Sequence, residues 1–241
     1  MDLGKRLEES LRFITVFSFQ LFGREIRVTE TVAVSWAVMA VLIGFALIIR
    51  RNLRPRPQGL QCLVEAGVEF LNTVSKRYFG RRAHTYGPYI GTLFLFLLLA
   101  NCIPAITPIG VFGREPPFKL KPPSRDINFT AAAAVITIAM VLIGGIRARG
   151  LRGWAKTLIR PSPVMLPFNI MDYAIRPISL SLRLFGNMLG GFIIMVIIET
   201  VAPIGVPAVL SLYFDFFDGV IQALVFTFLT VLFVSEAVEA E

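Results

Sequence analysis

One arginine lies inside a stretch that otherwise has the composition of a membrane-spanning helix. Arg183 sits in an apolar run that extends from Ile178 to Val201. A guanidinium stays protonated in proteins, so the bilayer must accommodate a permanent charge, at a cost of about 2.5–3.5 kcal/mol on insertion scales. Charges kept inside a membrane usually serve a charged partner or an ion pathway. We therefore expect Arg183 to bind a charged partner or to line an ion pathway.

The polar residues around Arg183 recur at helical spacing. Residues three and four positions apart lie on one side of a helix. The members of this face are Arg176, Ser179, Arg183, Asn187 and Gly190. Gly186 and Gly190 add a small-xxx-small pair, which lets another helix approach closely within a membrane. The pattern predicts a contact face for a partner, with ordinary helix packing inside the chain as the alternative.

The last apolar segment carries a second polar face. Asp215, Asp218 and Gln222 are spaced three and four positions apart, and Ser211 and Glu236 extend their side of the helix. Two carboxylates and an amide aligned within about 20 apolar residues suggest a hydrated path. Alternatively, Asp215 pairs with a cation of the neighbouring helix, and Asp218 reaches out to the membrane interface.

Two further acids flank the arginine. Glu199 lies near the predicted external end of its helix, where it could also reach the interface, and Asp172 lies near the internal end. A fixed positive charge between two water-filled paths opposes a leak of cations and favours the ionised form of a carboxylate beside it. A partner carboxylate that passes Arg183 would release its cation and reload from the other path. The membrane potential supplies roughly 2.3 kcal/mol per unit charge per 100 mV, so ion flow would drive partner movement.

The composition is that of an integral membrane protein. Of the 241 residues, 55% are hydrophobic and 17% charged, and the mean hydropathy is +0.70, whereas soluble domains rarely exceed about 50% apolar residues. No secretory leader is evident. Two cysteines and one histidine predict no disulfide framework, metal or cofactor. The net charge of +8 lies in loops beside apolar segments, which indicates lipid and protein contacts and no nucleic acid.

The apolar runs predict an all-α protein with one membrane domain over residues 1–241. The expected spanning helices, each long enough for one crossing, are residues 31–49, 88–111, 128–146, 169–202 and 207–236. Residues 59–79 alternate apolar and polar sides at helical spacing, which predicts an amphipathic helix on the cytoplasmic membrane surface or a short helix packed on a partner. Residues 1–30 are expected to form an external segment.

The loop charges predict the orientation. Residues 50–87 hold eight basic and two acidic residues, and residues 147–162 hold five basic and no acidic residues. On the other side, residues 1–30 are balanced and residues 110–127 hold four basic and two acidic residues. By the positive-inside rule, the N-terminus is external and the C-terminus cytoplasmic.

Three segments resemble one known family. Pro177–Met188, with the sequence PISLSLRLFGNM, is similar to the signature of subunit a of F-type ATP synthases, and Ile221–Phe226 and Pro163–Pro167 resemble its neighbouring segments. The resemblance implies a stator whose last two helices are long, tilted and lie along a ring of c subunits. Arg183 would face the ring carboxylate between two half-channels, with Asn187 and Gln222 beside it and with Ser179, Gly186 and Gly190 touching the ring.

The chain departs from the family pattern in two places. Many members have an ionisable residue where this chain has Phe192 and a glutamate where it has Asn169. The external path would then depend on Asp215, Glu199 and Asp218, and the internal path on Asp172.

The resulting hypothesis is a stator subunit that passes protons, or sodium ions, to and from a c-ring. It implies partnership with the b-type peripheral stalk and the rest of the F1F0 complex, in a bacterial plasma membrane or, alternatively, a thylakoid. No Walker-type Gly-x-x-x-x-Gly-Lys motif occurs, so we expect no nucleotide site and no enzymatic activity of the chain by itself. The rivals are a stand-alone secondary transporter with Arg183 binding an anionic substrate, and a structural subunit of a redox complex.

Overall fold

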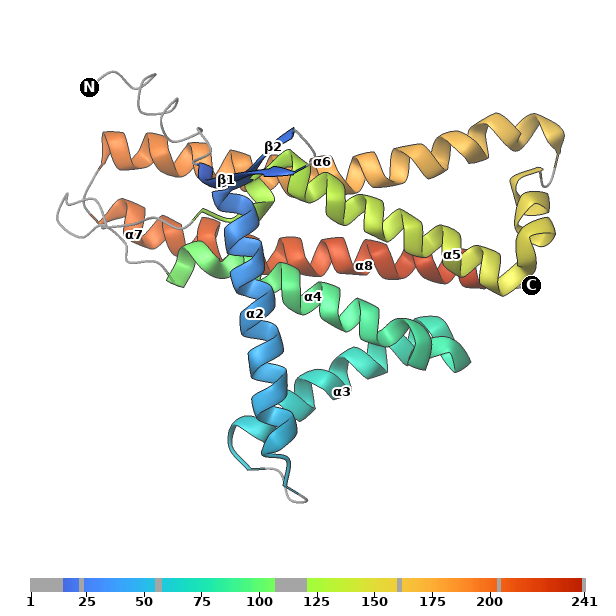
Figure 1. The fold of residues 1–241 in the computed structure, drawn as a ribbon, viewed down its shortest axis with the longest axis horizontal. Coiled ribbons are helices and arrows are strands. Elements are labelled where there is room, and N and C mark those ends of the chain that lie inside the picture. Colours follow the sequence, from blue (N-terminus) through green and yellow to red (C-terminus); the bar gives the residue numbers. More distant parts are fainter. Residues whose placement is uncertain are drawn as a thin grey trace. The chain divides into compact units, whose positions relative to one another are not determined.

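The chain is built almost entirely from helices. Its computed structural model describes residues 15–21, 24–54, 58–106, 121–159, 162–202 and 205–239 (Figure 1). Within these residues, five helical stretches are long and apolar enough to cross a membrane. They are Glu30–Arg51, Leu60–Ile103, Ile127–Ile159, Pro163–Val201 and Val209–Val238. The prediction of an all-α polytopic membrane protein with about five spanning helices is confirmed.

The helices begin close to the starts of the apolar runs. In chain order they are α2 (Glu30–Arg51), α3 (Leu60–Phe79), α4 (Ala83–Ile106), α5 (Ile127–Ile159), α6 (Leu166–Val201), α7 (Val206–Ser211) and α8 (Asp218–Val238). A π-helical segment, Leu212–Phe217, joins α7 to α8. Residues 107–111 of the expected second span lie outside the described residues, as do residues 1–14 of the expected external segment.

Helix α5 continues well past the expected end of the third span at Ile146. The apolar pattern stops at Arg147, but arginine and lysine are good helix formers and do not end a helix. The interruption comes at Gly150, whose φ of 72° and ψ of 163° are readily adopted only by glycine. The arginine-rich end of α5 is therefore a second helical piece with its own direction.

A β-hairpin precedes α2. Strands β1 (Thr15–Leu21) and β2 (Arg24–Thr29) pair antiparallel, with Phe19 opposite Ile26. Both strands are rich in β-branched and aromatic residues, which favour extended backbone. The hairpin lies in the segment to which the residue pattern assigned no secondary structure.

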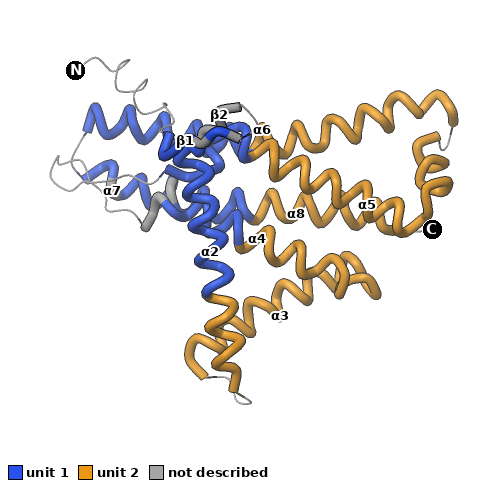
Figure 2. The backbone as a smooth tube through the Cα atoms, in the orientation of Figure 1, with its two compact units in different colours: residues 1–44, 96–129, 184–223 blue, residues 45–95, 130–183, 224–241 orange. Residues whose placement is uncertain are grey.

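The chain divides into two compact units (Figure 2). Unit 1 comprises residues 1–44, 96–129 and 184–223. Its apolar core joins Val34 and Val38 of α2 to Ala100 of α4, and these residues are 7%, 5% and 0% exposed. In the same unit, the Ser124 hydroxyl donates a hydrogen bond to the Asn101 side-chain oxygen.

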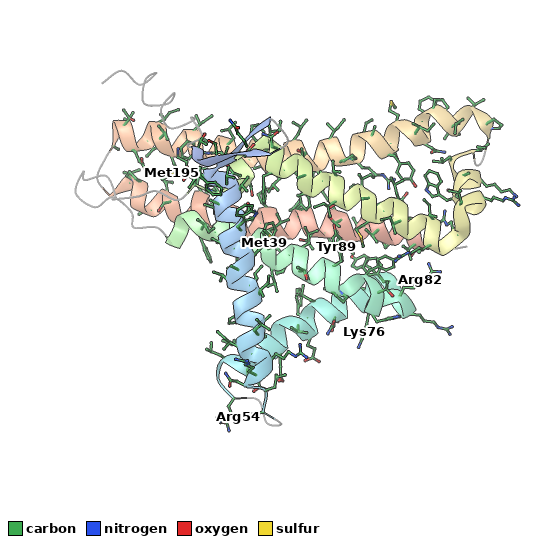
Figure 3. The ribbon with its side chains drawn as sticks, in the orientation of Figure 1. Met39, Arg54, Lys76, Arg82, Tyr89 and Met195 are labelled. Atoms are coloured by element: carbon green, nitrogen blue, oxygen red, sulfur yellow. The ribbon has the colours of Figure 1, made fainter. Side chains whose placement is uncertain are left out.

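Unit 2 comprises residues 45–95, 130–183 and 224–241. Its apolar core contains Phe79, Tyr86, Ile90, Val141, Val231, Val234 and Val238. Hydroxyl groups join the same helices: Tyr89 Oη lies 3.4 Å from Thr137 Oγ1, which lies 3.5 Å from Thr230 Oγ1. Figure 3 labels Tyr89 on α4. Such hydrogen bonds replace water for polar groups that face neighbouring helices in a membrane.

Arginines cover the carboxyl end of α8. The Arg82 guanidinium, labelled in Figure 3, donates to the carbonyl of Val238, and Arg149 donates to the carbonyls of Glu236 and Glu239. The last carbonyls of a helix have no partner within the helix, and positive charge is favourable there. This end of α8 is therefore fixed within unit 2.

Gly219 of α8 lies against the backbone of α4 within unit 1. A Cβ added there would lie 3.1 Å from the Asn101 carbonyl oxygen and 3.3 Å from its carbonyl carbon, so the backbone would have to shift. We expect Gly219→Ala to destabilise the protein by about 1–3 kcal/mol, measured as a lower thermal unfolding midpoint of the detergent-purified protein.

Gly44 provides the matched control. A Cβ added to Gly44 of α2 would meet no atom within 4 Å, and alanine is favoured over glycine in helices by about 1 kcal/mol. Gly44→Ala should leave the midpoint unchanged or raise it. Equal effects of the two substitutions would contradict the close approach.

Candidate functional site

Helix α6, which carries Arg183, has one covered side and one open side. The covered side carries Leu180, Leu184 and Met188, which are 2%, 1% and 5% exposed. The open side carries Ser179, Arg183 and Asn187, all exposed. Both sets repeat every four residues, as a helix with 3.6 residues per turn requires. Three residues of the polar face predicted from the spacing, Ser179, Arg183 and Asn187, thus lie on the open side of α6, whereas Arg176 and Gly190 are half-buried.

Arg183 has no acidic partner within the described parts of the chain. It is exposed, and the ion pairs found in these residues join other side chains. A Cβ added to Gly186 or Gly190 would meet no atom within 4 Å, so neither glycine is required by packing among the described residues. At Ser179, Arg183, Gly186 and Asn187, the described residues therefore leave this side of α6 uncovered.

A second arginine on α6 has the opposite environment. Arg176 forms a two-bonded pair with Glu236 of α8, at 2.9 Å and 3.1 Å between guanidinium nitrogens and carboxylate oxygens. A third bond, of 3.3 Å, joins Arg176 to Asp172. The guanidinium also lies over the Phe233 ring, 4.9 Å from its centroid. Asp172 lies four positions before Arg176 on the same helix, whereas nothing in the sequence indicated the register with Glu236.

The structure describes the side chains of some, but not all, of the polar residues predicted in the last span. Gln222 is 5% exposed, and its amide donates to Asp218 Oδ1 over 3.5 Å, so these two predicted residues meet. Asp215 falls within the π-helical segment, and its side chain lies outside the described set. π-Helical turns recur at functional sites, and here the wider turn precedes Asp218.

Glu199 is half-buried in the last turn of α6. It takes part in an interaction of its own and is not a solvent-exposed acid. For metals, the described residues contain no group of three His, Cys, Asp or Glu side chains that could hold an ion.

The family of the chain follows from a comparison over most of its length. Residues 32–235 match the family model described as ATP synthase A chain. The chain belongs to the ATP synthase A chain family. The matched region contains most of α2, all of α3 to α7 and most of α8, including the open side of α6. The resemblance seen in the sequence is confirmed.

Membership in the ATP synthase A chain family gives the general function of the chain. The chain is a proton-translocating stator subunit of the F0 sector, a multi-pass membrane subunit that is not itself catalytic. Its partners are the c-ring and the rest of the ATP synthase.

The first departure from the family pattern has a structural role here. The Asn169 amide donates to the carbonyl of Leu158 over 2.8 Å, one of the last carbonyls of α5, which lack a partner within their helix. A glutamate has no proton to donate when ionised and would leave this carbonyl without its bond. Asn169 therefore connects the end of α5 to the start of α6.

The second departure, Phe192, lies beneath a buried arginine. The Arg125 guanidinium carbon is 4.1 Å from the centre of the Phe192 ring, and Arg125 is only 3% exposed. An arginine over an aromatic face is attracted by the ring quadrupole. Phe192 thus stabilises a buried cation of this chain.

Burial shifts the pKa of Arg125. Removal from water lowers the pKa of Arg125 to about 10, while Glu30 and Asp126 raise it. A pKa near 10 still leaves the guanidinium protonated at neutral pH. Arg125 is therefore a second permanent charge enclosed in the protein, in a turn just before α5.

The sequence contained no clear signal for Arg125. It lies in the short turn Pro123–Arg125, in a charged segment expected to be an external loop. The neighbouring Ser124 is 0% exposed and Asn101 is 1% exposed, which a polar loop composition does not predict. Asn101 also donates to the Gly219 carbonyl over 3.4 Å, so this turn is part of the buried interior of unit 1.

We expect Phe192→Leu to destabilise the complex by about 0.5–2 kcal/mol, because leucine retains the apolar contact but loses the ring face under Arg125. The measurement is thermal unfolding of the detergent-purified complex. Phe168→Leu on the same helix, at a position 57% exposed, should have no effect. If Arg125→Gln and Phe192→Leu destabilise additively when combined, the two residues do not interact.

Proposed function

We propose that the chain conducts protons, or sodium ions, through two half-channels that meet the c-ring at Arg183. One half-channel opens outside and the other opens to the cytoplasm. Arg183 separates them as a fixed positive charge that meets the ionised ring carboxylate. We call this residue the gate. Ion flow then turns the ring, and the other subunits of the complex use the rotation to make ATP.

The observation that carries this proposal is the open side of α6. Arg183 is exposed there, its described surroundings supply no carboxylate, and the adjacent Gly186 leaves open space. A permanent charge within a bilayer needs a counter-charge. A carboxylate from a separate subunit supplies one, whereas a stand-alone transporter would enclose the arginine within its own chain.

The charge gives direction to the ion path. A carboxylate next to Arg183 is favoured in its ionised form and so releases the ion it carries. The same positive charge repels cations and prevents a continuous leak between the two paths. Each unit charge that crosses gains roughly 2.3 kcal/mol per 100 mV, which is the energy available for rotation.

The two inlets are assigned to different acids. We assign the external inlet to Asp215, Asp218 and Glu199, with Gln222 and Asn187 as polar neighbours of the gate. The internal inlet is assigned to Asp172, whose side chain is 62% exposed. Ser179, Gly186 and Gly190 form the contact with the ring.

The remaining proposals concern the binding partner, the membrane and the orientation of the subunit. The subunit is proposed to bind the b-type peripheral stalk and to lie in a bacterial plasma membrane with its C-terminus in the cytoplasm. The positive loops on either side of the amphipathic helix α3 support this orientation. A thylakoid location is the alternative.

The gate is tested by Arg183→Ala in the whole complex. We expect ion-driven ATP synthesis in vesicles to fall by about 100-fold or more, because a preorganised charge at the transfer site is lost. Passive ion leak after removal of the catalytic sector should rise.

Arg147→Ala is the matched control for the gate, since Arg147 is an exposed arginine of α5. It should leave both synthesis and leak unchanged. Full coupled synthesis by the Arg183→Ala complex would remove the proposed function.

The external inlet is tested by Asp215→Asn. An amide cannot carry a proton as a carboxylate does, so we expect synthesis to slow by about 10- to 100-fold, with the largest loss at low external ion concentration. The measurement is the rate of ATP synthesis against external pH and sodium. An unchanged dependence would mean that Asp215 has a structural role only.

A further inference from the structure

The surroundings of Arg176 suggest a function beyond holding two helices together. Arg176 shares unit 2 with Arg183 and lies seven positions before it on α6. Seven residues advance a helix by roughly 10.5 Å and leave the two side chains within about 20° of each other around the axis. Two permanent cations therefore follow one another along the same side of α6.

The two cations differ in what covers them. The Arg176 side chain is 20% exposed and holds two carboxylates, Glu236 through two bonds and Asp172 through one. The Arg176 guanidinium also lies over the Phe233 ring. Arg183 is exposed and has no such partner among the described residues. Three of the five N–H donors of Arg176 thus bind carboxylates, while no carboxylate of the described residues binds Arg183.

Other charges near this cluster do not compete for Glu236. Arg149, the neighbouring cation, donates to backbone carbonyls at the end of α8, those of Glu236 and Glu239. The two carboxylate oxygens of Glu236 both face Arg176. A two-bonded arginine–carboxylate pair is stronger and more directional than a single contact, so Glu236 is the main partner and Asp172 the second one.

We propose that Glu236, helped by Asp172, masks Arg176, so that α6 offers a passing c-ring carboxylate one available cation, Arg183. This inference rests on the function proposed above. An unmasked Arg176 would present a second pairing site on the same side of the helix. A ring carboxylate held there would have to break a charge-assisted pair before the ring could advance, and rotation would stall.

The proposal differs from a simple tie between α6 and α8. A tie is weakened equally by removing either partner. Masking is asymmetric: removing Glu236 exposes a competing charge, whereas removing Arg176 removes the competitor itself. The double substitution should then work better than Glu236→Gln alone.

The experiment measures ion-driven ATP synthesis per assembled complex in membrane vesicles. We expect Glu236→Gln to lower the rate by about tenfold, the order of one charge-assisted pair, with a normal yield of assembled complex. Arg176→Gln alone should be milder. Glu236→Gln combined with Arg176→Gln should restore most of the rate.

Glu239→Gln is the matched control. Glu239 is an exposed acid at the same end of α8, its backbone carbonyl binds Arg149, and its carboxylate makes no contact with Arg176 among the ion pairs found. It should leave the rate unchanged.

Three results would overturn masking. They are a normal rate for Glu236→Gln, a loss that lies wholly in the yield of assembled complex, and a double variant as slow as Glu236→Gln. The first would mean that Arg176 does not compete, the second that the pair is a structural tie, and the third that the Glu236 carboxylate acts on ions itself.

Arg183→Ala assayed in parallel separates the two ideas. If that variant loses synthesis while Glu236→Gln is normal, only masking fails. If Arg183→Ala retains synthesis, the gate itself fails.

Discussion

The structure depends on how each permanent positive charge is accommodated away from water. A guanidinium cannot lose its proton to lower the cost of burial, as a carboxylic acid can gain one. Arg125 is covered by an aromatic ring and lies beside Asp126, and Arg176 holds two carboxylates over another ring. Arg183 has neither kind of partner within the described residues. Among the described residues, the protein thus compensates Arg125 and Arg176 itself, and we propose that the c-ring compensates Arg183.

Uncharged polar groups away from water are likewise paired with one another. Within unit 2, hydroxyls on α4, α5 and α8 lie within hydrogen-bond distance of one another, and Thr130 meets Ser181 at 3.1 Å between their oxygens. Within unit 1, Asn101 connects a turn to α8. Helices in a membrane gain little from apolar contact alone, because lipid is equally apolar. The contact between Thr130 and Ser181 therefore helps to fix the register of α6 against α5 within unit 2.

Much of the fold and one side of the site follow from the sequence, because both are local. The five spanning helices came from run length, and the open side of α6 came from residues spaced three and four apart. The pair between Arg176 and Glu236 could not be predicted, since the periodicity of one helix carries no register with another. The burial of Arg125 was missed because its segment has the composition of a loop. The π-helical turn before Asp218 also escaped, because it changes backbone spacing without a distinctive residue.

The departures from the family pattern acquire a physical meaning from their contacts. The family resemblance leads one to expect ionisable groups at positions 169 and 192. The residues present there, Asn169 and Phe192, both make contacts within the chain, with the Leu158 carbonyl and with the Arg125 guanidinium. Restoring a glutamate at 169 would remove a helix-end hydrogen bond, and an acid at 192 would meet a cation and form a buried ion pair rather than a proton carrier. Both residues are therefore part of local contacts that an acidic side chain would change, which explains why neither position is assigned to the ion path of this chain.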